Sequence, residues 1–533
     1  MTKDMNFMKH SFSWKRKNLA NRRMRLPYLP AAVLVLFLLL MPHALVYGQQ
    51  PHDHGHSTEP VVLETISVTA ERIEAYVENY PHQVSVMGQK EILSRNMLGV
   101  EEALSAMDGV DVKRGSGIGS RISIRGSGNS GKVLVLLNGR PLNSNQYGGV
   151  DLSTIPIDMV QSITVFKPPA PVWLGPGASD GAVSIITRNA LEKEKRRSSK
   201  MRLAAGSYGY VEGSASQQLK YDSDMFMASA GGSHADGKRV NSDRNTGSAS
   251  LHWDRERSEA QRIELDGRFY ASEYGSAGPL DNPTPDARQT YRQASLDGRM
   301  SGLLEDNGEY ALNLYGDMID LKDESQSGFT STLDDMKWGI KGERCWNDEN
   351  DLWSVRLNGI FESDEVDHTL SGFHRRVAAG LGAQADRRWN ALAATAGMRG
   401  DQTSDFDFSP GFSGGLSYGL TAHWLARINA GYSVKTPTFG QLYQPSHGSI
   451  DQVRGNPDLD EERIWSYDAG IEYRKDKDHL VQVSLFRSDI RDPIVYQRGA
   501  DRVYQPVNAD RSWRHGVEAT FKRMLENGLT VDA

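Results

Sequence analysis

Three histidines, His52, His54 and His56, are spaced two residues apart in a polar, proline-containing stretch. Imidazole nitrogens at alternate positions of an extended segment could share a transition-metal ion, which makes the three weak candidate metal ligands. A solvated linker that happens to contain histidine is the better interpretation, because no further ligand near them in sequence completes a closed set. The sequence therefore predicts no metal site and no cofactor.

Other residues that could carry chemistry also lack the necessary neighbours. Cys345 is the one cysteine of the chain, so it has no disulfide partner within it, and no nearby base is visible that would activate its thiol. Gly115–Gly119 looks like a fragment of a dinucleotide-binding loop, but its third glycine falls one residue early and no ribose-binding acid is placed. P-loop, zinc-protease and nucleophile-elbow motifs are missing. The sequence thus predicts that the protein is not an enzyme.

The start of the chain has the pattern of an export signal. Basic residues precede the apolar run Ala31 to Met41, and the small residue Gly48 follows at a suitable cleavage position. The run is too short to span a membrane as a helix. We predict a cleaved signal peptide over residues 1–48 and a disordered periplasmic tail over residues 49–63.

The composition fits either a large soluble protein or a β-barrel. Of the 533 residues, 24% are charged and 38% are hydrophobic, and no second apolar run is long enough for a transmembrane helix. Barrel strands alternate apolar and polar residues, so they never form a hydrophobic block. The 52 glycines and 20 tyrosines favour β structure with many tight turns. The net charge of −7 is mild for this length and gives no reason to expect nucleic acid as a partner.

Two domains are predicted from the periodicity. Residues 71–190 read as a compact α/β unit with one or two short helices over 90–107 and a buried strand over 133–137. Asn138-Gly139 is a strong hairpin turn signal after that strand, and Asp151 or Ser153 suits a helix cap.

From residue 197 to 533 the pattern alternates with period two, as in 465–473 and 481–485. A soluble sandwich would place its apolar face inward, so alternation alone does not decide which face meets lipid. The export signal and the aromatic strand ends favour a transmembrane antiparallel β-barrel with apolar residues outside.

Three stretches, in this order, resemble the TonB-dependent receptors of bacterial outer membranes. The first resembles the TonB box and consists of Glu64, Thr65, Ile66, Ser67, Val68, Thr69 and Ala70. The second resembles a short plug domain and comprises residues 107–112, 122–126, 133–142 and 182–187. The third resembles a late-barrel signature and comprises residues 431–439 and 455–462. Residues 167–177 depart from the plug pattern, because prolines and Trp173 stand where relatives usually have an Arg-Gly-Pro segment and a Tyr-Gly pair.

The resemblance implies an α/β plug inside a transmembrane antiparallel β-barrel of about 22 strands. It implies energised uptake of a scarce large nutrient across the outer membrane of a Gram-negative bacterium, with a ferric siderophore or cobalamin as the favoured cargo. That membrane has no ion gradient and no nucleotide supply. The TonB protein of the inner membrane would therefore pair with the box as an added β-strand and pull on it. The expected partners are this protein, outer-membrane lipid and a small-molecule chelate, with the receptor itself a monomer.

The resemblance also indicates where the ligand binds. In similar plugs the loops after the Val-Asp-Val segment and after the hairpin face outward, and here these loops are residues 114–120 and 143–149. The candidate ligand-facing residues are Arg114, Ser116, Ile118, Asn143, Asn145, Gln146 and Tyr147. Amides and a tyrosine suit a large, partly polar chelate. The alternative is an ordinary surface loop.

Two other classes of protein explain less of the sequence. A passive outer-membrane channel or an adhesin barrel would explain the strands and the export signal but not the box or the plug hairpin. A soluble periplasmic enzyme would explain only the signal.

The length of the second domain also predicts a C-terminally truncated barrel. At about 10 residues per membrane strand and roughly 20 with extension and turn, it holds about 16 or 17 strands. It also ends on Ala533 rather than on an aromatic residue.

Overall fold

The computed structural model describes residues 81–114, 119–128, 133–187, 196–258, 261–304, 308–348, 352–445, 453–476, 479–524 and 530–532. All of these belong to one compact unit. The predicted signal peptide, the periplasmic tail with its three histidines, the TonB box, Ser116 and Ile118 lie outside the described residues. Across the described ranges, no helix combines the length and the apolar character needed to span a membrane.

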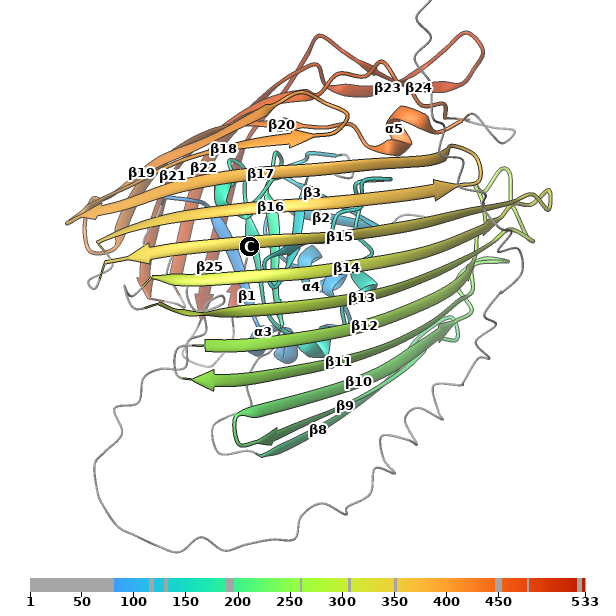
Figure 1. Cartoon of the computed structure of the whole chain (residues 1–533), viewed down its shortest axis with the longest axis horizontal. Helices are drawn as coiled ribbons and strands as arrows, with labels where there is room; N and C mark the ends of the chain where they lie inside the picture. The colour runs from blue at the N-terminus through green and yellow to red at the C-terminus, as the bar shows by residue number, and fades with distance from the viewer. Residues whose placement is uncertain are drawn as a thin grey trace, which may run out of the picture. The chain divides into compact units, whose positions relative to one another are not determined.

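A small α/β domain covers residues 84–187 (Figure 1). Its five-stranded sheet has the order β1 (Val84–Gly88), β6 (Val160–Phe166), β7 (Ala182–Thr187), β4 (Leu134–Leu137) and β5 (Arg140–Pro141). Strands β4 and β7 pair in parallel, whereas the other pairs are antiparallel. Every residue of β4 and β7 is buried, as expected for strands covered on both faces.

Short helices and a second ribbon complete this plug domain. They are α3 (Gln89–Ser94), α4 (Val100–Ser105), η1 (Leu152–Thr154), η2 (Ile157–Met159), η3 (Val172–Leu174), β2 (Val110–Arg114) and β3 (Ser120–Ile124). The predicted hairpin is present, with Asn138 and Gly139 at φ of 49° and 87° between β4 and β5. The predicted cap is present as well, because the Asp151 carboxylate accepts a hydrogen bond from Ser153 N at 3.0 Å.

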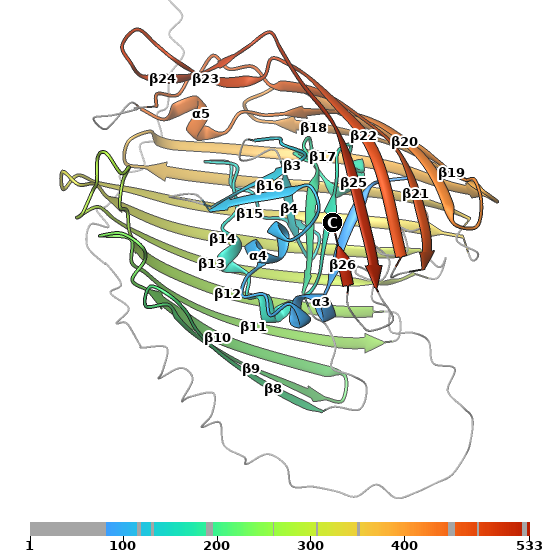
Figure 2. The same ribbon diagram turned by 180° about the vertical axis from the view of Figure 1, so that it is seen from behind.

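The remaining strands form one long, curled antiparallel sheet around the plug (Figures 1 and 2). They are β8 (Arg197–Ala205), β9 (Val211–Tyr221), β10 (Asp224–Ala235), β11 (Arg244–Ser258), β12 (Gln261–Gly275), β13 (Arg288–Leu303), β14 (Glu309–Glu324), β15 (Thr330–Asn347), β16 (Trp353–His368), β17 (Gly372–Trp389), β18 (Leu392–Thr403), β19 (Ser409–Gly419), β20 (Trp424–Lys435), β21 (Glu462–Asp476), β22 (His479–Arg491), β25 (Arg511–Met524) and β26 (Thr530–Asp532).

The strand order returns from β26 to β8. Among the described residues, β26 pairs with β25 through residues 522–524 alone, so the strand that forms this seam is short. In the described part of the chain, no strand pairs with the outer edge of β25 from Arg511 to Phe521. The curled sheet therefore does not close along its full height.

Alternate residues of the long strands face opposite sides of the sheet. On β21, Trp465 is 44% exposed on the outside, whereas its neighbours Ile464 and Ser466 are buried on the inner side. Elsewhere the inward positions are mostly small or polar, and many carry serine, asparagine, glutamine or aspartate. The predicted orientation, with apolar residues outside and polar residues inside, is confirmed.

The two ends of the barrel differ in their connections. At one end the turns are short, such as residues 222–223 and 390–391. At the other end, residues 436–461 contain α5 (Phe439–Tyr443), and residues 492–510 contain the hairpin β23 (Ile494–Arg498) and β24 (Tyr504–Asn508). Outer-membrane barrels have short periplasmic turns and longer external loops, so the α5 end is the external one.

Candidate ligand-binding end and plug anchors

The predicted ligand loop, residues 143–149, is shaped by its own side chains. The Asn143 amide accepts a hydrogen bond from Val135 N at 2.8 Å and donates to the carbonyl oxygens of Val133 and Gly148 at 3.0 and 2.9 Å. At its base the loop meets the other predicted loop, since Ser120 N donates to Val150 O at 2.8 Å. The backbone of Arg114 pairs with that of Ser120. The described ends of loop 114–120 therefore lie at the base of loop 143–149.

The tip of this loop is held between the barrel wall and α5. Ser144 Oγ donates to Asp335 on β15 at 2.9 Å, and Asn145 Nδ2 donates to Asp364 on β16 at 2.8 Å. On the other side the carbonyl oxygens of Asn145 and Gln146 accept from the first backbone N–H groups of α5, at 2.9 and 2.8 Å. The loop is therefore docked at the external end of the lumen.

Gln146 and Tyr147 differ in their placement. Gln146, predicted to face the ligand, is instead fully buried, because α5 covers it. An added Cβ on Gly440 of α5 would lie 2.8 Å from Gln146 O, so only glycine permits this approach. Tyr147 is half-buried against a cluster that includes Phe439. Burial raises the pKa of the Tyr147 hydroxyl above its usual value, so the group stays protonated and can donate.

The part of this end that α5 builds was not predicted from the sequence. The Thr438 hydroxyl accepts from Gln441 N at 3.2 Å, and the Gln441 side chain accepts from Thr438 N at 2.9 Å. This capping box starts the helix and could have been recognised from Thr-x-x-Gln in the sequence. It brings Tyr443 onto His374 of β17, with ring centroids 4.0 Å apart.

Next to these rings, the Arg376 guanidinium lies 4.8 Å from the Phe439 ring and pairs with Asp405 at 2.6 Å. Aromatic rings and one paired cation thus border the predicted loop.

A buried arginine anchors the plug to one wall. Arg125 Nη2 lies 2.7 Å from Asp468 on β21, and its Nε lies 2.8 Å from Glu518 on β25. The Arg125 side chain is completely buried. Lys167 of the plug joins the same Glu518 at 3.2 Å, and burial lowers the pKa of this lysine. Buried charges of this kind are tolerated only when they are paired.

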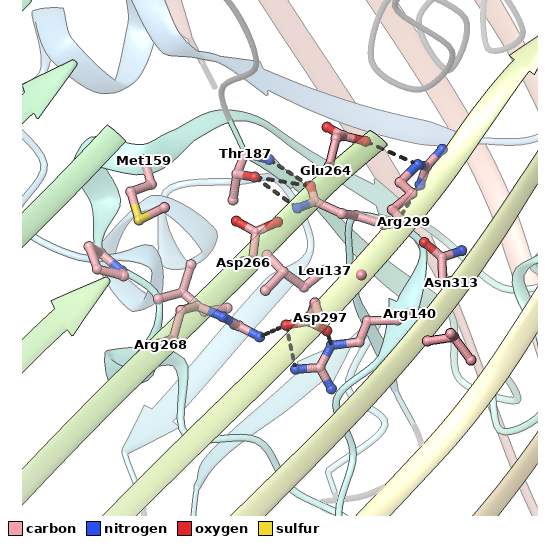
Figure 3. Close-up of a pocket in the computed structure, with 15 residues that line it drawn as sticks. Leu137, Arg140, Met159, Thr187, Glu264, Asp266, Arg268, Asp297, Arg299 and Asn313 are labelled. Carbon is pink, nitrogen blue, oxygen red and sulfur yellow. Dashed lines mark hydrogen bonds and ion pairs between the residues drawn. The ribbon is translucent and has the colours of Figure 1, made fainter. Parts of the chain in front are cut away.

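A second anchor lies on the opposite side of the plug. Arg140 of β5 donates to Asp317 on β14 at 2.9 Å and also pairs with Asp297 on β13. Figure 3 shows Arg140 and Asp297 at a small pocket between plug and wall, which Glu264 and Arg299 also line. Arg299 donates to the Asn138 carbonyl oxygen at 2.7 Å. Because its acids and bases are paired with one another, the pocket is part of the plug anchor.

The unusual plug segment 167–177 is fitted into the wall by shape. Arg356 stacks on Trp173 at 4.2 Å, and Arg399 donates to Val172 O at 2.9 Å. An added Cβ on Gly431 would lie 2.7 Å from Pro169 Cβ, and one on Gly397 would overlap the Val172 side chain. Glycines on β18 and β20 therefore make room for the prolines of the plug.

In the described parts of the chain, no group of three or more histidine, cysteine, aspartate or glutamate side chains is arranged to hold a metal ion. Cys345 is buried and has no disulfide partner.

Two family models match the chain. One, described as TonB-dependent Receptor Plug Domain, matches residues 77–182. The other, described as TonB dependent receptor-like, beta-barrel, matches residues 195–532.

Individual proteins give the same picture. The vitamin B12 transporter BtuB of Vibrio vulnificus (strain CMCP6) is 25% identical over 494 residues, which cover 88% of this chain and 77% of the relative. The crystal structure of the siderophore receptor PirA from Pseudomonas aeruginosa superposes with a TM-score of 0.72 at 18% identity, covering 84% of this chain and 83% of that one. A mutant of the ferric enterobactin receptor PfeA from the same organism, in complex with enterobactin, gives 0.68 at 18% identity, covering 84% and 79%. At these identities the structures show a shared fold.

Proposed function

The chain belongs to the TonB-dependent receptors, and we propose that its cargo is a ferric siderophore or cobalamin, bound outside and carried inward by energised uptake. Members of this family are outer-membrane receptors and transporters rather than enzymes. The observation that carries the proposal is the plug, which fills the lumen and is fixed to opposite walls by Arg125 and Arg140. A large solute cannot pass until those contacts change.

The work needed to move the plug has to arrive mechanically. We infer that the box, Glu64 to Ala70, pairs with the TonB protein as an added β-strand after export of the chain with a cleaved signal peptide. The contacts of residues 81–83 support this route. Asn429 donates to the Pro81 carbonyl oxygen at 2.7 Å, and the Gln83 side chain accepts from Ser484 at 3.0 Å and from Arg125. A pull that enters from the box side reaches the Arg125 anchor first.

The ligand, in this proposal, first meets the aromatic surface at the external end. Tyr147 and Asn145 would contact it, together with residues 114–120, among them Arg114, Ser116 and Ile118. A tyrosine hydroxyl that stays protonated, amide groups and ring faces suit a large chelate with both polar and flat parts. The relatives named for vitamin B12 and for siderophores support these two cargo classes.

The coupling is tested by Ile66→Pro in the full-length receptor. Proline removes a backbone donor and fixes φ, so strand addition fails and labelled uptake is lost, whereas ligand binding to whole cells stays unchanged. Ile66→Val is the matched control, because it keeps every backbone hydrogen bond and should transport normally. Normal uptake by the proline variant would contradict the proposed coupling. Growth of a deletion strain on single siderophores or on cobalamin identifies the cargo.

A further inference from the structure

Three arginines lie side by side on the outer face of the barrel. Arg463 on β21 pairs directly with Arg491 on β22, which in turn pairs with Arg511 on β25. All three are exposed, and Figure 2 shows their strands side by side. We call these residues the arginine row. Like charges directly opposite each other in a sheet are destabilising, so such a row calls for anions from outside the strands.

The rows that follow place the arginines relative to the membrane. Towards the middle of the membrane, the next row of outward-facing residues consists of Trp465, Asp489 and Trp513. It is followed by Tyr467, Arg487 and His515, and then by Ala469, Leu485 and Val517. Near the other end of β21, Tyr473 packs on Trp424 with ring centroids 5.1 Å apart.

These rings define the two aromatic girdles of the membrane band. The eight residue steps from Trp465 to Tyr473 span about 27 Å along the strand and, at a tilt of about 40°, roughly 21 Å across the membrane. This is close to the apolar band of about 25 Å between the aromatic girdles of such barrels. The arginine row thus lies one step beyond the external girdle, at the level of the lipid headgroups.

Acidic neighbours do not cancel this charge. Arg463 pairs with Asp492 at 2.9 Å and Arg511 with Asp510 at 4.0 Å, but both pairs are exposed. Exposed ion pairs of this kind contribute little. Arg491, in the middle, forms no ion pair with any acid in the described parts of the chain.

The row is local rather than part of a basic belt. On the outer face of β14, β15 and β16, one row of directly paired residues consists of Asp320, Asp334 and Asp367. Three arginines in one row are thus found on β21, β22 and β25, whereas β14, β15 and β16 carry three aspartates in a row.

We propose that the arginine row binds the phosphate groups of the phosphorylated glycolipid that forms the outer leaflet of this membrane. Guanidinium groups bind phosphate through two parallel hydrogen bonds. Trp465 and Trp513 lie at the interface, where tryptophan is favoured, and the apolar rows below them meet the acyl chains. The partner is therefore a lipid with an anionic head, held on the outside of the barrel and distinct from the transported cargo.

The test uses the full-length receptor purified from outer membranes and offered bis-phosphorylated lipid A in mild detergent, with the bound lipid counted by native mass spectrometry. Each arginine near a charged surface contributes on the order of 1 kcal/mol. Removing both phosphates from the lipid, or introducing Arg463→Gln, Arg491→Gln and Arg511→Gln together, should therefore lower its affinity by at least about tenfold. Arg292→Gln with Arg375→Gln, two exposed arginines on β13 and β17, is the matched control and should leave binding unchanged.

Equal binding of the dephosphorylated lipid to the unaltered receptor would overturn the proposal, and this comparison needs no variant. Full binding by the triple glutamine variant would overturn it as well. If the triple glutamine variant does not assemble, the variant with lysine at all three positions decides instead. It keeps the positive charge, so it should bind more of the phosphorylated lipid than of the lipid without phosphates.

Discussion

Arg125 anchors the plug to one wall of the barrel. Its partners Asp468 and Glu518 lie 343 and 393 residues away in sequence. No local pattern could have paired Arg125 with these two acids, although the family resemblance did place residues 122–126 in the plug. In the same way, Gln146 could be placed on the correct loop, but its burial depends on α5, which lies almost three hundred residues later.

Replacing Arg125 by leucine should loosen the plug. The change leaves buried Asp468 with only the more distant Arg427, at 4.0 Å, as a counter-ion. Breaking a buried ion pair typically costs about 3–5 kcal/mol. We expect faster proteolysis of the plug and leakage of large antibiotics into cells. Arg125→Leu combined with Asp468→Asn should regain part of the loss, and Arg121→Leu, at an exposed site on β3, should behave like the unaltered receptor. A tight, protease-resistant plug in Arg125→Leu would show that this ion pair is not an anchor.

His82 makes the seating of the plug sensitive to acid. Burial lowers the pKa of its imidazole from 6.5 to about 4. In the folded plug the ring stays neutral down to about pH 4, whereas in the unfolded chain it takes up a proton below pH 6.5. Stability is therefore full above pH 6.5 and falls by up to about 1.4 kcal/mol per pH unit as the pH drops towards 4.

Hydrogen exchange of residues 81–88 at pH 7 and pH 5 measures this effect. Protection should drop at pH 5 in the unaltered receptor but much less in His82→Gln. His423→Gln, at an exposed turn, serves as the control and should keep the full pH dependence. An equal drop in the His82 variant would assign the effect to other groups.

At the scale of elements, period-two alternation predicted the strands, because alternate side chains of a strand point to opposite faces. The lipid-facing side needed the export signal and the aromatic strand ends as well. The helices α3 and α4 and the hairpin at Asn138-Gly139 also follow from local signals. The hairpin of β23 and β24 and the position of α5 over the plug loop were not predictable, since tertiary contacts place them. The departure at residues 167–177 was visible in the sequence, but its complement, the glycines on β18 and β20, was not.

These glycines give a prediction for element packing. Gly397→Ala should push Val172 off the wall and cost about 1–3 kcal/mol of plug seating, as overpacking usually does. The readout is again proteolysis of the plug and antibiotic leakage. Val172→Ala together with Gly397→Ala should restore the seating, because the smaller side chain frees the space. Gly247→Ala on β11, where an added Cβ meets nothing within 4 Å, should have no effect. Normal seating of Gly397→Ala would mean that the segment has room to shift.

For the molecule as a whole, the family resemblance predicted the plug inside the barrel, and the structure confirms that arrangement. The proposed mechanism then requires the plug to move. In a Cys345→Ser background, Ser144→Cys with Asp335→Cys replaces a 2.9 Å hydrogen bond between plug and wall by a potential disulfide. The oxidised receptor should bind its ligand but fail to transport it, and reduction should restore transport.

Each single cysteine variant serves as the control and should transport in both redox states. Full transport by the cross-linked receptor would show that loop 143–149 stays on the wall during uptake.

The inner wall of the barrel is mostly polar, and this has a consequence for how often the receptor can work. A hydrogen bond between plug and wall contributes only about 0.5–1.5 kcal/mol, since water replaces it when it breaks. An apolar contact of the same area would instead have to expose its apolar surface to water when the plug moves. At a polar wall, water molecules that enter can replace the hydrogen bonds between plug and wall one at a time. In the proposed mechanism, the plug would then leave and return along the same wall, so that one receptor would complete many rounds of import.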